Sequence, residues 1–251
     1  MRISVKNPYA TDFSHTNLCL RPNLQTEQEW GINMKKLAII HTTPVTVPAI
    51  KALVLERTDE VEVINLLDDS MLPEINRAGR ITEAVRERLT CMIRMAELSG
   101  AWAVLSACSS IGGAMEEAGA ATDLPVYRID SPMAEAAAGY ERIGVAATLC
   151  STIAPTTELI RRKAAGAGRE PAVESLVIQG AGNLLRAGKE AEYDALVRNE
   201  LGKLARSNDI VVLAQASMAR AIAGLSEEEK SRYLTSPVSG VEAVLGKLAD
   251  L

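Results

Sequence analysis

A cysteine followed by two serines is the segment of this chain best suited to chemistry. Residues 106–113 read SACSSIGG, so Cys108 follows a short apolar run and precedes two hydroxyls and two glycines. A thiol between a strand end and a helix start meets unpaired backbone N–H groups and the positive end of the helix dipole. Both lower its pKa from about 8.5, so we expect Cys108 to act in proton transfer or as a nucleophile. The alternative is a small buried cysteine that packs as an apolar residue.

His41 is the second candidate catalytic residue, because it ends the apolar run of residues 37–40. A neutral imidazole at that position would take the proton of Cys108 or hold its thiolate as an ion pair. The alternative is a ring that only hydrogen-bonds near the end of its strand.

Hydroxyl-rich clusters follow four of the apolar runs. Hydroxyls and helix-terminal N–H groups bind a carboxylate or a phosphate well, although Ser and Thr also cap helices wherever a strand turns into a helix. No GxGxxG or GxxxxGK[ST] motif follows a strand, so a nucleotide site lacks its usual support. The expected substrate-binding residues are Thr42, Ser109, Ser110, Thr148, Cys150, Ser151, Thr152, Gln215 and Ser217.

The chain carries an internal duplication. The segment LAIIHT at residues 37–42 returns as IGVAAT at 143–148, and AVLSACS at 103–109 returns as VVLAQAS at 211–217. The two copies keep their order and lie roughly 105 residues apart, which indicates a duplicated α/β half rather than a solenoid of short repeats. In this alignment Cys108 falls opposite Ala216, so the second half lacks the thiol of the first.

Short apolar runs alternate with amphipathic helical segments, as in right-handed βαβ crossovers. Near-continuous apolar runs are typical of strands buried on both faces of a parallel sheet. We expect an α/β fold of two pseudo-symmetric domains, each a mostly parallel sheet flanked by helices, with the site in the cleft between them. The expected strands are residues 36–40, 61–66, 101–106 and 126–129 in the first half and 143–147, 175–178, 210–214 and 233–235 in the second.

Four segments follow from this pattern. Residues 1–33 show neither helix nor strand periodicity and are expected to form a loose N-terminal extension, with Met34 as an alternative native start. Residues 34–140 form the first α/β half and residues 141–236 the second. A terminal helix, about residues 237–251, is expected to pack back on the first half.

Composition excludes several classes of protein. The 251 residues are 47% hydrophobic and carry a net charge of −5, with no basic cluster for a nucleic acid. No apolar run has the roughly 20 residues that a membrane span needs, and no signal peptide is evident, so we expect a cytoplasmic protein without a membrane partner. Four cysteines without a CxxC pair, and two histidines, predict reduced thiols and no metal site.

The chain resembles the aspartate/glutamate/hydantoin racemase superfamily. The resemblance rests on the two α/β halves, the cysteine after the third strand, and the segments RIDSPMAE at residues 128–135 and RIGVAAT at 142–148. It implies a small carboxylate substrate, a homo-oligomer, and a cofactor-independent reaction in which one thiol from each half handles a proton. It matches Cys108 to the first thiol, Ala216 to the second, and His41 to an assisting Asp of some relatives. Residues 148–152 match the loop that grips the substrate carboxylate.

Three functions remain open at this point. The first is an isomerase or racemase acting on the carbon next to a carboxylate, although Ala216 makes racemisation by two thiols doubtful. The second is a single-cysteine decarboxylase, lyase or isomerase of a small di- or oxoacid. The third is a carboxylate-binding protein without catalysis.

Overall fold

The computed structural model describes the backbone of residues 34–250 and the side chains of residues 34–248. The predicted extension at residues 1–33 lies outside the described residues, as do His15 and Cys19. The first half comprises β1 (Lys35–His41), α1 (Thr46–Leu55), β2 (Val61–Leu67), α2 (Met71–Ala78), α3 (Glu83–Leu98), β3 (Ala101–Ser106), the 3-10 turn η1 (Ser109–Ile111), α4 (Gly112–Gly119), β4 (Val126–Arg128) and α5 (Ser131–Ala137). The second comprises β5 (Arg142–Ala147), α6 (Cys150–Gly166), β6 (Ala172–Val177), α7 (Ala181–Arg186), α8 (Glu190–Leu204), β7 (Ile210–Leu213), η2 (Ala216–Met218), α9 (Ala219–Ile222), α10 (Glu227–Lys230), β8 (Tyr233–Thr235), α11 (Ser236–Gly246) and η3 (Lys247–Asp250).

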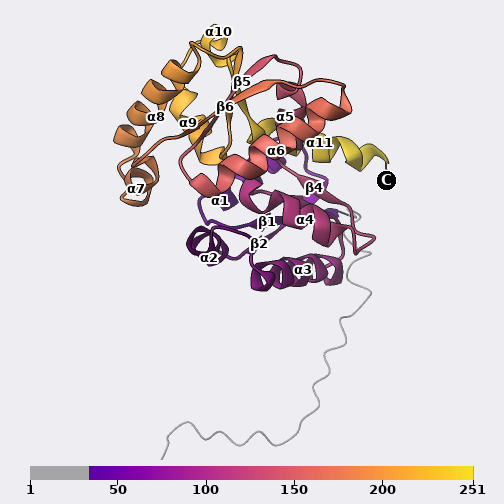
Figure 1. Cartoon of the computed structure of the whole chain (residues 1–251). Helices are drawn as coiled ribbons and strands as arrows, with labels where there is room; N and C mark the ends of the chain where they lie inside the picture. The colour runs from indigo at the N-terminus through magenta and orange to yellow at the C-terminus, as the bar shows by residue number, and fades with distance from the viewer. Residues whose placement is uncertain (1–33, 251) are drawn as a thin grey trace, which may run out of the picture. The chain divides into compact units, whose positions relative to one another are not determined.

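The described chain forms two four-stranded parallel sheets with the same topology. Their strand orders are β2-β1-β3-β4 and β6-β5-β7-β8, and helices flank each sheet (Figure 1). This confirms the predicted α/β class with two similar domains. The β6 strand begins at Ala172, three residues before the predicted start, because this strand is half exposed and its apolar run is broken.

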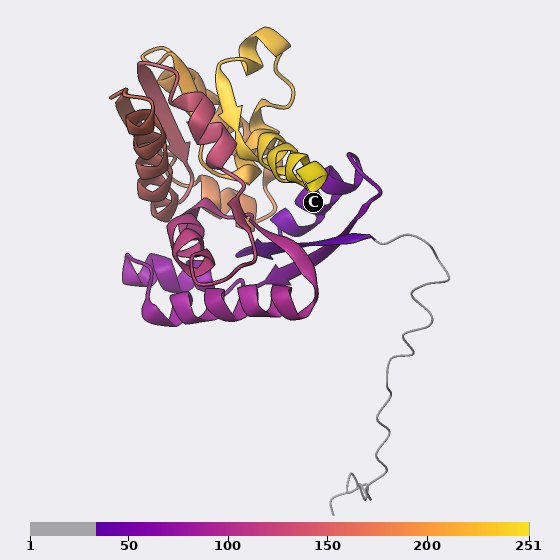
Figure 2. The same ribbon diagram turned by 90° about the vertical axis from the view of Figure 1, so that its right-hand side faces the viewer.

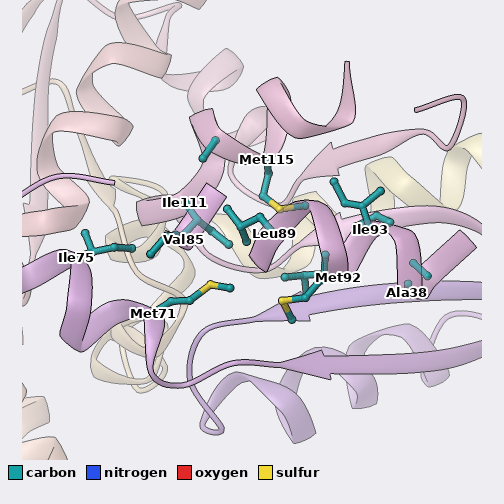
Figure 3. Close-up of a cluster of buried hydrophobic side chains, with 13 residues drawn as sticks. Ala38, Met71, Ile75, Val85, Leu89, Met92, Ile93, Ile111 and Met115 are labelled. Atoms are coloured by element: carbon teal, nitrogen blue, oxygen red, sulfur yellow. The ribbon is translucent and has the colours of Figure 1, made fainter. Parts of the chain in front are cut away.

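An aliphatic core separates each sheet from its helices. On one face of the first sheet, Val85 and Leu89 of α3 pack with Met71 of α2 and Met115 of α4 (Figure 3). All four side chains are fully buried. No helix among the described residues is both long and apolar enough to cross a bilayer.

Helix α11 follows the last strand of the second sheet but packs on the first half. Its Val241 and Val244 join Leu37 and Ile39 of β1 in one buried cluster, and the yellow helix lies beside the indigo first half in Figure 2. Gly240 permits this approach, because a Cβ atom there would lie 2.2 Å from the carbonyl oxygen of Ile129.

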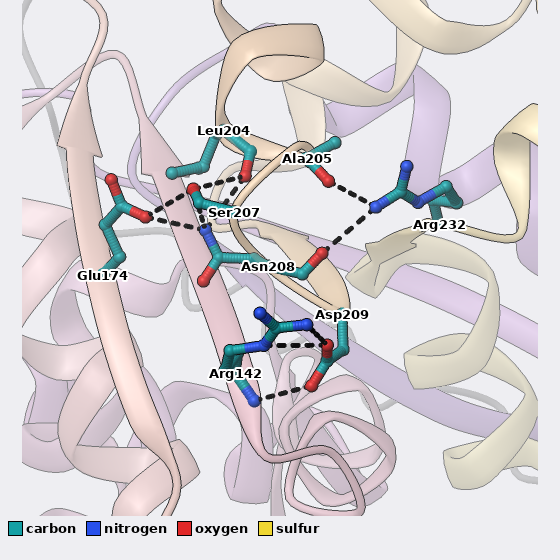
Figure 4. Close-up of polar contacts among 8 residues, drawn as sticks. All are labelled: Arg142, Glu174, Leu204, Ala205, Ser207, Asn208, Asp209 and Arg232. Carbon is teal, nitrogen blue, oxygen red and sulfur yellow. Dashed lines mark hydrogen bonds and ion pairs between the residues drawn. The ribbon is translucent and has the colours of Figure 1, made fainter.

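Polar contacts hold the amino-terminal end of the second sheet (Figure 4). The Arg142 guanidinium donates to Asp209 at 2.6 Å and its backbone N–H donates to the same carboxylate at 2.9 Å. The buried Asn208 amide donates to the carbonyl of Leu204 at 2.9 Å. These contacts lie at the opposite end of the strands from the residues predicted to do chemistry.

Candidate active site

Cys108 lies just beyond the carboxyl end of β3. Ala107 N–H extends the sheet by donating to the carbonyl of Ile40 at 2.9 Å, and Cys108 then keeps an extended backbone (φ −139°, ψ 118°) before η1 begins. The side chain packs against the core cluster under α3 and α4 but remains partly exposed. The thiol therefore stands at the border between the core and solvent.

Burial raises the pKa of the Cys108 thiol, opposite to the expected direction. The Thr42 hydroxyl, the backbone N–H groups of Ser110 and Ile111 and the Ser110 hydroxyl lie near the sulfur and act against this shift. The Thr42 hydroxyl is buried and makes no hydrogen bond to the described residues, so it is available to a thiolate at Cys108. The prediction of a lowered pKa was wrong because desolvation of the thiolate outweighs these donors. The resting thiol is protonated, and the donors are in place to stabilise a thiolate.

His41 is fully buried at the end of β1, but the structure does not join it to the thiol by a hydrogen bond. Its Nδ1 lies 2.8 Å from Thr46 Oγ1 and its Nε2 lies 3.0 Å from Asn65 Oδ1. Burial lowers the pKa of His41, so the ring is neutral at pH 7, and both nitrogens have partners. In this arrangement neither nitrogen is free to take the proton of Cys108. The imidazole instead fixes the end of β1 to β2 and to the start of α1.

Gln215 occupies in the second half the place that Cys108 occupies in the first. Cys108 and Gln215 both have extended backbones and directly precede 3-10 turns, η1 and η2. Their preceding residues make matching sheet contacts, because Ala214 N–H donates to the carbonyl of Ala146 at 2.9 Å. The expected pairing of Cys108 with Ala216 is therefore wrong by one residue, since Ala216 starts η2 and matches Ser109.

The side chains at these two positions meet equivalent threonines. The thiol of Cys108 faces Thr42, and Gln215 Oε1 accepts from Thr148 N–H at 2.5 Å and from Thr148 Oγ1 at 2.9 Å. Thr42 follows β1 directly, as Thr148 follows β5. The pseudo-symmetry thus pairs a titratable thiol in one half with an amide in the other.

The start of α6 joins the two halves next to the thiol. Thr152 Oγ1 lies 3.1 Å from Ser110 Oγ, and both side chains are buried. Ser151 has a buried hydroxyl without a partner among the described residues, while Cys150 is exposed. The structure therefore brings Ser110, Thr152 and the first turn of α6 to one place.

Ser109 and Ser217 lie in the two 3-10 turns. Ser109 is the buried first residue of η1. Ser217, the second residue of η2, is partly exposed and its hydroxyl faces the buried hydroxyl of Tyr193. Burial raises the pKa of Tyr193. The substrate-binding roles expected for Ser109 and Ser217 stay predictions.

Sequence reasoning missed a buried ion pair beside η1. The Arg128 guanidinium donates to both carboxylate oxygens of Asp130, at 2.9 and 2.8 Å, and to Glu116 at 3.3 Å. Asp130 directly precedes α5, but its side chain makes no cap hydrogen bond to that helix. A Cβ at Gly112 would lie 2.3 Å from Arg128 Cζ, so the guanidinium uses the space that this glycine leaves.

Among residues 34–250, no group of three or more His, Cys, Asp or Glu side chains is placed to share a metal ion.

Comparison with known proteins connects this geometry to a family. The family model described as Asp/Glu/Hydantoin racemase matches residues 32–244. Comparison with curated protein sequences finds no match.

Three solved structures share the fold. Glutamate racemase RacE1 from Bacillus anthracis has a TM-score of 0.66 and 16% identity, covering 86% of this chain and 82% of its own. Aspartate racemase from Picrophilus torridus has a TM-score of 0.64 and 12% identity, covering 85% and 94%. Allantoin racemase from Klebsiella pneumoniae has a TM-score of 0.62 and 15% identity, covering 86% and 88%. Because the family model spans both sheets and the cysteine between them, this chain belongs to the Asp/Glu/hydantoin racemase family.

Proposed function

We propose that this protein is a cofactor-independent enzyme that transfers a proton to one face of the carbon next to the carboxylate of a small acid. Cys108 is the group that transfers the proton. The observation that supports the proposal is the mirrored pair of contacts, thiol to Thr42 in one half and amide to Thr148 in the other. Only the first pair contains a group that titrates.

The environment of Cys108 favours a proton donor. Burial raises its pKa, so the thiol holds its proton at neutral pH. When the proton leaves, the N–H groups of Ser110 and Ile111 and the hydroxyl of Thr42 stabilise the thiolate that remains. A group of this kind protonates a carbanion more readily than it generates one. Loss of CO₂ from a diacid therefore fits the site best. The C–C bond to the departing carboxylate breaks, its electron pair stays on the α-carbon, Cys108 supplies the proton there, and the thiolate takes a proton back from water.

Gln215 would stabilise charge on the opposite face. Its Oε1 accepts from a backbone N–H, which fixes the orientation of the amide, and its Nε2 has no hydrogen bond to the described residues. That N–H₂ group is able to donate to the enediolate that forms as the carbanion spreads onto the carboxylate. An amide does not exchange protons at neutral pH, so it does not replace the second thiol of a two-base racemase.

The first turn of α6 is the proposed carboxylate site. The helix has 17 residues, and no side chain caps its amino terminus. Unpaired N–H groups and the helix dipole at such an end attract an anion. The partnerless Ser151 hydroxyl and the Thr148 hydroxyl lie in the same segment. An anion bound there would be next to Ser110, which also contacts the thiol.

The experiment is turnover in deuterated water of a panel of small amino, hydroxy and dicarboxylic acids, with released CO₂ and deuterium at the α-carbon both measured. We expect deuterium on one face of the α-carbon and a single product configuration. The Cys108→Ser variant should lose a factor of about 10² to 10⁴ in rate, which is the usual contribution of a positioned acid or base. Cys91→Ser is the matched control, since Cys91 is an exposed thiol on α3. Full activity in Cys108→Ser would overturn the proposal.

Two other outcomes would favour the alternatives. Deuterium on both faces with inversion would indicate a racemase in which a water serves the second face. Tight binding of an acid without exchange or turnover would indicate a carboxylate-binding protein.

A further inference from the structure

A cavity of about 440 Å³ lies along the length of α1, between that helix and the segments η2 and α11. This volume falls in the range of about 300 to 1,000 Å³ that is usual for small-ligand sites. Its walls are mainly apolar. They include Val45, Thr46 and Ala49 from the first half and Ala216, Ser217 and Val238 from the second.

The segments that line the cavity follow directly on residues of the proposed reaction site in both halves. The segment after β1 contributes Thr42 to the thiol and, four residues later, Thr46 to the cavity wall. The segment after β7 contributes Gln215 to the position opposite Cys108 and, immediately afterwards, Ala216 and Ser217 to the wall. The carboxyl ends of β1 and β7 therefore position both the reacting groups and the cavity.

The charges on the lining do not suit an acidic side chain. Glu56 and Arg220 are its charged residues. The Arg220 guanidinium is already paired, with Asp194 at 2.9 Å and with Glu190 at 2.7 Å. A second carboxylate on the substrate would lie near these acidic side chains. The one cation among the described lining residues is already paired and would not be available to bind it.

Apolar side chains at the mouth indicate what the cavity takes instead. Val45 is 54% exposed and Val238 is 42% exposed, and they stand at the starts of α1 and α11. An apolar ligand group between them removes both surfaces from water, which is favourable in proportion to the apolar area covered.

We propose that this cavity binds the hydrophobic side chain of the substrate, so that the substrate is a carboxylic acid with an aliphatic or aromatic substituent rather than an acidic one. This inference rests on the proposed function, because it assumes that the carboxylate and the α-carbon lie between the thiol and Gln215. Each added methylene in such a pocket is worth about tenfold or more in specificity.

The test is calorimetric binding of 3-phenylpropanoate and of glutarate to the full chain. We expect 3-phenylpropanoate to bind at least tenfold more tightly. Ala49→Phe fills the cavity from an exposed position on α1 and should abolish this preference. Lys51→Phe is the matched control, exposed on the same helix and outside the cavity lining, and should leave the preference unchanged. Val238→Asp is a second variant, because an acid in the first turn of α11 suits the helix dipole while it places a charge at the mouth.

The outcomes separate this inference from the proposed function. If glutarate binds as well as 3-phenylpropanoate, or if neither Ala49→Phe nor Val238→Asp weakens the aromatic acid, the cavity assignment is overturned. Cys108-dependent proton exchange would still support the proposed reaction in that case. If the cavity variants weaken the aromatic acid but no acid takes up deuterium at its α-carbon in a Cys108-dependent way, the proposed reaction fails and the binding site for the apolar group remains.

Discussion

Replacing Gln215 with cysteine should give the enzyme a second proton-transfer group. The new thiol would stand where Gln215 Oε1 now accepts from Thr148 N–H and Oγ1, at 2.5 and 2.9 Å. Those donors would stabilise its thiolate as Thr42 and the η1 N–H groups do for Cys108. In the native protein the amide at this position does not exchange protons at neutral pH, so exchange on the second face should be slow.

The expected gain is a factor of about 10² to 10⁴ in second-face exchange, the usual contribution of a positioned acid or base. This corresponds to about 3 to 5 kcal/mol of activation free energy. The loss of stability should be small, because Gln215 is partly exposed and the change removes two hydrogen bonds of about 1 kcal/mol each.

The assay is chiral chromatography of the product, together with α-deuterium content in deuterated water. Gln215→Cys should turn a single configuration into a mixture of both. Ala216→Cys is the control, since this residue starts η2 and lines the cavity rather than the site. If Ala216→Cys rather than Gln215→Cys produced the second configuration, our structural alignment of the halves would be refuted. If neither variant did so, the mirrored-site reasoning itself would fail.

Three further predictions concern titration and packing. Because burial lowers the pKa of His41, the unfolded state binds a proton more readily, so the free energy of unfolding should fall as pH drops below about 6.5. Urea unfolding of His41→Gln should show a smaller loss of stability at acid pH. An unchanged dependence of stability on pH in that variant would contradict this. Because burial raises the pKa of Cys108, its thiolate absorbance should appear at a higher pH than that of free cysteine. The measurement is a pH titration of the protein with Cys108→Ser as the reference. A thiol pKa below that of free cysteine would contradict the described site. Gly240→Ala should destabilise the fold by about 1 to 3 kcal/mol in denaturant unfolding, since its Cβ meets the Ile129 carbonyl, whereas Gly246→Ala on the same helix has open space; equal effects of the two changes would argue against the docking of α11.

Local patterns predicted the fold well. Strands buried on both faces need unbroken apolar runs, and this requirement identified all eight strands of the described chain. The start of β6 was missed because an edge strand exposed on one side does not need such a run. The family was recognisable for a related reason, since segments at equivalent strand ends keep similar residues in both halves.

The candidate site was predictable in its residue types but not in its contacts. Hydroxyls and a thiol at strand ends follow from the sequence, because parallel strands place their carboxyl ends at one edge. His41 has the right position for a base, yet the distant Asn65 and the nearby Thr46 take its two ring nitrogens. The direction in which the pKa of Cys108 shifts depends on how much of the core surrounds the sulfur, and no local sequence pattern predicts that.

The sequence by itself determined two α/β halves, one of which lacks a second thiol, because apolar periodicity and residue identity are local properties. Only the tertiary structure decided that Gln215 rather than Ala216 is the residue of the second half that corresponds to Cys108. The sequence alignment of the two halves is ambiguous by one residue at this point. Sheet contacts that join strands far apart in the chain remove the ambiguity. The cavity between α1 and η2 likewise exists only because segments more than a hundred residues apart fold against each other.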